Sequence, residues 1–117
     1  MKLVVPEPES AALESALADR VLVASEVVEI ELRRAARRAG PDAERLVDLD
    51  LAQVSLVPLS ARIRRAAGTL SPASLRTLDA IHLATALALG ELDAVISYDR
   101  RLAHAARDRG LPVLSPA

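Results

Sequence analysis

The sequence predicts a layered α/β fold in which parallel strands are joined by helical crossovers. Short runs of valine and leucine alternate along the chain with longer segments of helical periodicity, which is typical of parallel strands joined by helical crossovers. The short runs are continuously apolar, as expected for strands that are buried on both faces of a sheet. No hairpin signal, internal repeat or linker interrupts the 117 residues, so we expect one domain.

The first elements of this pattern are short. Residues 1–5 are an apolar opening that is cut off by Pro6. Segment 9–19, ESAALESALAD, has the spacing of a helix, and Ser10 is suited to cap it. Residues 20–25, RVLVAS, are rich in valine and predict a strand.

Two longer helices and a strand follow. Segment 25–40, SEVVEIELRRAARRAG, repeats its apolar residues at helical spacing and ends at Gly40, a residue that commonly stops helices. Segment 41–53 predicts a further helix, because Pro41 is tolerated in the first turn. Residues 54–60, VSLVPLS, alternate like a strand.

The C-terminal half continues the alternation. Ser60 is suited to cap a short helix over 61–68, since a serine side chain accepts hydrogen bonds from first-turn N–H groups. The helix predicted over 77–90 is apolar nearly all round, so it should be buried on most faces. We expect the other elements to be a loop over 69–76, a strand over 93–98, a helix over 99–110 and a last strand over 111–115.

The composition excludes several classes of function. A formal net charge of −1 gives no global basic field, so nucleic-acid binding would need a local patch. The absence of cysteine excludes disulfides and thiolate chemistry and fits a reducing cytoplasm. Tyr98 is the only aromatic residue, which excludes a platform of several stacked rings. No apolar run approaches the ~20 residues of a membrane span, and no P-loop, dinucleotide fingerprint or serine-hydrolase motif is present.

Two aspartates stand where a parallel α/β sheet would place functional carboxylates. Ligands collect at the carboxyl ends of the strands in such sheets, and Asp99 directly follows the strand predicted over 93–98. Asp99 also opens the next helix, so a helix cap is its alternative role. Asp79 lies in the first turn of an apolar helix, where a carboxylate either complements the helix dipole or holds a metal ion. Spacing leaves both alternatives open.

The histidines give a weaker signal. His82 follows Asp79 by three residues and therefore shares a helix face with it. That pair resembles half of a zinc site, but His104 is the only other histidine and cysteine is absent. We therefore expect His82 to be a hydrogen-bonded, semi-buried residue.

The glutamates of the segment 25–40 differ in their local surroundings. Glu26 and Glu29 are first-turn acids, and Glu29 has Arg33 four residues on, the spacing of a helical ion pair. Glu31 meets an alanine at that spacing and has no such local partner. It is therefore either a solvated residue or a functional one.

Three segments carry a recognisable combination of motifs. They are VASEVVEIELRRAARR at 23–38, LRTLDAIHLATALALG at 75–90 and VISYDRRLAHAARDRGLPVLSP at 95–116. Together they resemble the PIN domain, and most of all the VapC-type toxins of bacterial toxin–antitoxin pairs. The pairing of LDAIHLA with a strand that ends in YDxRL is the most specific part. The resemblance covers essentially the whole chain and implies a PIN-like three-layer fold.

The resemblance also implies a site and a chemistry. In this family a cluster of acids holds Mg²⁺ or Mn²⁺ and cleaves RNA, and the matching residues here are Glu31, Asp79 and Asp99. Ser97 matches a small hydroxyl residue that supports the last of these. The residue types suit this task, because hard divalent cations prefer oxygen ligands, lower the pKa of bound water and stabilise charge on a phosphodiester.

The implied partners are an RNA substrate, a cognate VapB-type antitoxin and a second copy of the chain, with no membrane. An arginine-rich antitoxin segment reaching the carboxylates is chemically sensible. Several arginines are candidates for contacts with RNA phosphates, although each alone also fits a solvated or ion-paired surface residue. They are Arg33, Arg34, Arg76, Arg100 and Arg101.

The N-terminus departs from the family pattern. The family usually opens with a motif whose strand carries an aspartate, and MKLVVPEPES aligns with the tail of that motif. We therefore expect the N-terminal strand and its aspartate to be missing and the single domain over 1–117 to be N-terminally incomplete. Neither Glu7 nor Glu9 is expected to replace the ligand. Two explanations compete: a true start upstream of Met1, or a degraded copy that is weak or inactive as a nuclease.

Three functions remain open at this point. The first is a metal-dependent endoribonuclease toxin that hydrolyses RNA and is neutralised by an antitoxin. The second is a catalytically impaired PIN-like module that dimerises or binds the antitoxin without cleaving RNA. The third is a small structural domain whose acids are only caps and surface charges.

Overall fold

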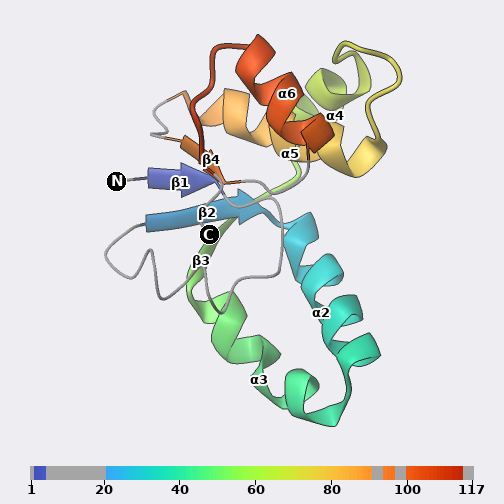
Figure 1. Cartoon of the computed structure of the whole chain (residues 1–117), viewed down its shortest axis with the longest axis vertical. Coiled ribbons are helices and arrows are strands. Elements are labelled where there is room, and N and C mark those ends of the chain that lie inside the picture. The colour runs from blue at the N-terminus through green and yellow to red at the C-terminus, as the bar shows by residue number, and fades with distance from the viewer. Residues whose placement is uncertain (1, 5–20, 91–93, 97–99, 115–117) are drawn as a thin grey trace.

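Helices alternate with the strands of one parallel sheet, which confirms the predicted α/β class (Figure 1). The computed structural model describes residues 2–4, 21–90, 94–96 and 100–114. The helix expected over 9–19 lies outside these residues. The strands are β1 Lys2–Val4, β2 Val21–Ser25, β3 Val54–Val57, β4 Ala94–Ile96 and β5 Val113–Leu114. The helices are α2 Val27–Ala39, α3 Pro41–Ala52, α4 Ala61–Gly68, α5 Thr77–Leu89 and α6 Arg100–Asp108.

The sheet has the strand order β3-β2-β1-β4-β5, and all neighbouring strands are parallel. The register places Leu3 of β1 opposite Leu22 of β2 on one side and Ala94 of β4 on the other. In chain order, β2 and β3 are therefore added on one side of β1, and β4 and β5 are then added on the other side of β1. Such a reversal is the point at which open α/β sheets bind ligands, beside the carboxyl ends of the strands.

The expectation that the sheet lacks an N-terminal strand is wrong. Residues Lys2–Val4 form β1, the central strand, which pairs with β2 and with β4. The physical reason is that the edges of β2 and β4 would otherwise carry unpaired backbone N–H and C=O groups, and a short apolar segment satisfies both. The segment Lys2–Val4 contains no acidic residue, so it does not supply the aspartate that the family places on this strand.

Local chemistry explains where several helices begin and end. The Ser60 Oγ accepts a hydrogen bond of 3.2 Å from the Ile63 N–H and caps α4, as predicted. Gly40, with φ +118°, separates α2 from α3, and Pro41 opens α3. Gly90 ends α5 with φ +69°, a conformation that side chains disfavour.

The core lies between the sheet and α5. The side chains of α5 from Ala80 to Ala86 are almost all buried, as its apolar sequence predicts, and α5 packs against β2. A cluster of buried residues joins α5 to α6: Leu83, Ala86, Leu102, Ala105 and Ala106. Figure 1 shows α4, α5 and α6 together on one side of the sheet, whereas α2 and α3 form a hairpin that extends from the other side. No helix within the described residues is long and apolar enough to cross a membrane.

Candidate active site

Glu31 projects from α2 toward α5. Its Oε1 lies 2.8 Å from the Nε2 of His82, and 24% of the Glu31 side chain is exposed to solvent. The start of α2 is held at the carboxyl ends of two strands. The buried Ser25 Oγ, at the end of β2, accepts a hydrogen bond of 3.3 Å from the Val27 N–H, and the Glu26 N–H donates to the Val57 carbonyl over 2.8 Å. The carboxylate of Glu31 therefore meets α5 near this edge of the sheet.

His82 is the partner of Glu31 that local spacing did not reveal. The prediction of a hydrogen-bonded His82 is confirmed, and the side chain is more deeply buried than expected, at 3% exposed. The two residues are separated by 51 positions in the sequence. The only signal that points to this pair in the sequence is a polar residue on an apolar helix together with a glutamate that lacks a local partner.

Asp79 lies one helical turn before His82, in the first turn of α5. The Asp79 side chain is partly buried, with its Oδ2 shielded from solvent. Because α5 runs into β4, its first turn is at the carboxyl edge of the sheet, and the helix dipole there favours a negative charge. Since residues three apart share a helix face, Asp79 is on the side of α5 that meets Glu31.

Asp99 and Ser97 lie outside the described residues, between β4 and α6 in the sequence. Their place in the chain is nevertheless informative. Both residues follow β4 in the sequence, and β4 is the strand next to β1 across the reversal of strand order, where such sheets bind ligands beside the carboxyl ends of the strands. The functional roles of both residues stay predictions.

The donor set fits a hard divalent cation. Glu31 and Asp79 offer carboxylate oxygens, which Mg²⁺ and Mn²⁺ prefer, and the bond to His82 engages one of the two Glu31 oxygens. No group of three acidic or histidine residues that could hold a metal gathers within the described part of the chain, and Asp99 is not in that part.

His104 lies 79% exposed on α6, where its Nε2 is 3.3 Å from Asp108, whereas His82 is buried.

Comparison with known proteins places the chain in a family. The profile of the PIN domain matches residues 1–108. The chain is 41% identical to Ribonuclease VapC46 of Mycobacterium tuberculosis (strain ATCC 25618 / H37Rv) over 119 residues, which cover 100% of this chain and 92% of that protein. The protein is a VapC-type PIN domain. It is also 39% identical to Ribonuclease VapC35 of the same strain over 122 residues, covering 99% and 90%.

The fold of this PIN domain also matches a solved structure. The match is to the crystal structure of VapBC2 from Rickettsia felis bound to a DNA fragment from their promoter. The TM-score is 0.68 at 13% sequence identity, and the match covers 97% of this chain and 98% of that chain. At this identity the likeness concerns the fold alone, and it confirms the PIN architecture.

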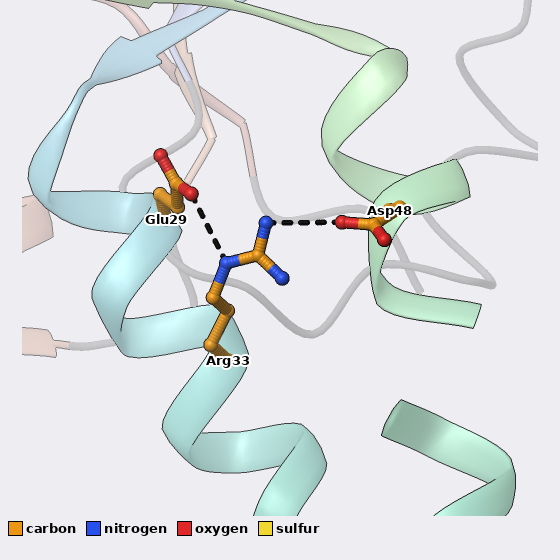
Figure 2. A network of polar contacts seen from close by, with 3 residues as sticks. All are labelled: Glu29, Arg33 and Asp48. Atoms are coloured by element: carbon orange, nitrogen blue, oxygen red, sulfur yellow. Dashed lines mark hydrogen bonds and ion pairs between the residues drawn. The ribbon is translucent and has the colours of Figure 1, made fainter. Parts of the chain in front are cut away.

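One predicted RNA-binding residue of the VapC-type chain takes part in an ion-pair network. Arg33 donates from Nε to Glu29 and from Nη2 to Asp48, each over 3.0 Å (Figure 2). The predicted pair of Glu29 with Arg33 is therefore present, and Asp48 extends it from α2 to α3. The hydrogen bond to Glu29, followed by that to Asp48, raises the pKa of Arg33 above its usual value. A contact of Arg33 with RNA stays a prediction.

We expect Arg33→Gln to lower the melting temperature slightly in dilute buffer. The loss should shrink in about 1 M NaCl, where the Debye length falls to about 3 Å and exposed ion pairs are screened. Differential scanning calorimetry at both salt concentrations measures this, with Arg34→Gln on the same helix as the matched control. An equal loss at low and high salt would show that Arg33 stabilises the hairpin by something other than charge.

The other predicted arginines are exposed. Arg34 is on α2, Arg76 directly precedes α5, and Arg100 and Arg101 open α6. The starts of α5 and α6 both belong to the carboxyl edge of the sheet. Arg76, Arg100 and Arg101 therefore lie on the same edge of the molecule as the first turn that contains Asp79.

Proposed function

We propose that this VapC-type PIN domain is a metal-dependent endoribonuclease toxin that hydrolyses RNA phosphodiester bonds. The observation that carries the proposal is the hydrogen bond between Glu31 and His82, because it joins the helix of Glu31 to the helix whose first turn contains Asp79. Relatives that carry the name ribonuclease VapC and are 34–41% identical over 98–100% of this chain support the same function.

Three carboxylates form the proposed centre: Glu31, Asp79 and Asp99. Mg²⁺ or Mn²⁺ bound there lowers the pKa of a bound water and neutralises charge on the phosphodiester. The chain itself holds the ligands in place: the dipole of α5 stabilises the ionised Asp79, and His82 donates to Glu31. Ser97 supports Asp99 with its hydroxyl group.

RNA contact is assigned to the exposed arginines. Arg34, Arg76, Arg100 and Arg101 bind phosphates, and Arg33 joins them at the cost of its ion pairs. Arginine suits this role because its planar guanidinium binds phosphate through two parallel hydrogen bonds. With one aromatic residue in the chain, the RNA is read through its shape and backbone rather than by stacking.

The proposed partners are a cognate VapB-type antitoxin and a second copy of this chain. The likeness in fold to VapBC2 of Rickettsia felis supports an antitoxin partner. The carboxylates offer such a partner a point of attachment, because an arginine side chain can pair with them in place of a cation. We place the protein in the cytoplasm, where an RNA-cleaving toxin meets its substrate.

The decisive experiment is a cleavage assay on the purified protein stripped of metal with EDTA. Structured RNA of mixed sequence is incubated with no added metal, with Mg²⁺, with Mn²⁺ and with Ca²⁺. Cleavage is expected with Mg²⁺ or Mn²⁺ and not in EDTA. Glu31→Gln should remove it, whereas Glu44→Gln, an exposed acid on α3, should retain it. Cleavage that persists in EDTA would contradict the proposal.

One observation favours a second function. The central strand β1 contributes no carboxylate from Lys2–Val4, and a centre short of one ligand binds its cation more weakly. A PIN-like module that dimerises or binds the antitoxin without cleaving RNA is the alternative. Antitoxin binding by a folded protein that cleaves no RNA with any of the three metals would select this alternative.

A further inference from the structure

His82 is an unusual residue for its surroundings. It lies on α5 among buried alanine, leucine and threonine side chains, and 3% of its own side chain is exposed. An apolar residue of similar size would fill this space without desolvating a polar ring. The Nε2 atom reaches Glu31 over 2.8 Å. The Nδ1 atom is buried and has no hydrogen-bond partner among the residues that the structure describes.

The contact assigns the proton of the ring. An ionised carboxylate only accepts hydrogen bonds, so the Nε2 of His82 carries the proton and donates to Glu31. The Nδ1 atom on the other side of the ring takes no part in this contact. His82 is therefore a donor with a fixed direction, because the packed core around α5 holds the ring in place.

Glu31 has the opposite character. Its side chain is 24% exposed, and it extends from α2, which belongs to the projecting hairpin rather than to the core around α5. A glutamate side chain with several rotatable bonds samples many rotamers unless a partner holds it. The hydrogen bond with His82 selects those rotamers that hold the carboxylate against α5, one helical turn from Asp79.

We propose that His82 is a positioning residue, which orients the Glu31 carboxylate beside Asp79 so that the two acids present their oxygens to one divalent cation. The inference rests on the proposed function and extends it to a residue that is not itself a metal ligand. Residues that hold a ligand in this way typically contribute about 10–100-fold to metal affinity.

Three substitutions separate positioning from packing. His82→Gln places an amide N–H close to the position of Nε2, whereas His82→Asn places one close to Nδ1, and His82→Leu keeps the volume without a donor. Thr85→Val is the matched control, because Thr85 is also buried on α5 and donates to the Ile81 carbonyl over 2.8 Å. It removes a buried polar group without touching Glu31.

The readouts are the affinity for Mn²⁺, measured by calorimetry and electron paramagnetic resonance without RNA, and the melting temperature of the metal-free protein. We expect His82→Leu and His82→Asn to weaken Mn²⁺ binding by about 10–100-fold. His82→Gln and Thr85→Val should stay within about threefold of the wild type. The melting temperature of His82→Leu should be equal to or above that of the wild type, because an apolar side chain suits the core.

The outcomes distinguish the two proposals. If the wild type binds Mn²⁺ and His82→Leu binds it equally well, the positioning role is wrong while the metal-dependent function stands. If His82→Gln and His82→Asn weaken binding equally, the role of His82 is structural rather than directional, and this pair decides the matter even if His82→Leu does not fold. If the wild type binds no Mn²⁺, the metal-dependent function fails and the positioning role fails with it.

Discussion

Asp79→Asn is expected to lower the rate of metal-dependent RNA cleavage by about 100-fold or more. Asparagine has nearly the same shape but no charge, so it removes a hard anionic ligand. A metal ion contributes several kcal/mol of charge stabilisation in the transition state, and each loss of about 1.4 kcal/mol slows a reaction tenfold. The helix dipole of α5 loses its complementary charge as well, which is a smaller effect.

The measurement is kcat/KM on one RNA with saturating Mg²⁺ or Mn²⁺, together with the circular dichroism spectrum of each variant. Asp108→Asn is the matched control, because the Asp108 side chain on α6 is 65% exposed and lies beside His104. It should cleave RNA at the wild-type rate. A folded Asp79→Asn protein with full activity would remove Asp79 from the active site and leave it the structural role of a first-turn charge.

Leu83→Ala is expected to lower the free energy of unfolding by about 2–5 kcal/mol, the range found for large-to-small changes in protein cores. Leu83 is 1% exposed and belongs to the cluster that joins α5 to α6, with Leu102 and Ala106 among its members. Alanine removes apolar area and leaves a cavity, because the neighbouring alanines are too small to fill it. A domain of this size has about 5–15 kcal/mol of stability, so the change is a large share of the total.

Urea denaturation followed by circular dichroism measures this loss. Leu87→Ala is the matched control on the same helix, since Leu87 is 37% exposed. Its expected loss is below about 1 kcal/mol, as is usual for substitutions away from the core. A similar loss for both variants would mean that α5 is not the centre of the core.

The helices and strands were largely predictable because their signals are local. Ser60 was predictable as a cap because a serine side chain can accept a hydrogen bond from the N–H of the residue three positions later. Glycines with positive φ ended α2 and α5 at Gly40 and Gly90. The pair of Glu29 with Arg33 followed from the spacing of one helical turn. Each of these predictions needed only residues within four positions of one another.

The central strand shows how the same kind of reasoning fails. By its sequence the apolar opening matches the tail of a family motif, and this match predicts that the strand is missing. Whether Lys2–Val4 becomes a strand depends on the unpaired edges of β2 and β4, which come from distant parts of the chain. A segment of three residues has too weak a local preference for the strand conformation to be predicted as a strand, because its conformation is decided by the strands beside it.

The sequence by itself determined the α/β class and most element bounds, and the family resemblance pointed to acidic residues whose roles stay predictions. The tertiary structure alone decided which of these side chains meet. Glu31 and His82 are 51 residues apart, and Arg33 reaches Asp48 on the next helix. Periodicity reports the face of a helix on which a residue lies. It does not report which helix or strand packs against that face, because this depends on how the parallel sheet and its crossovers place the helices in space.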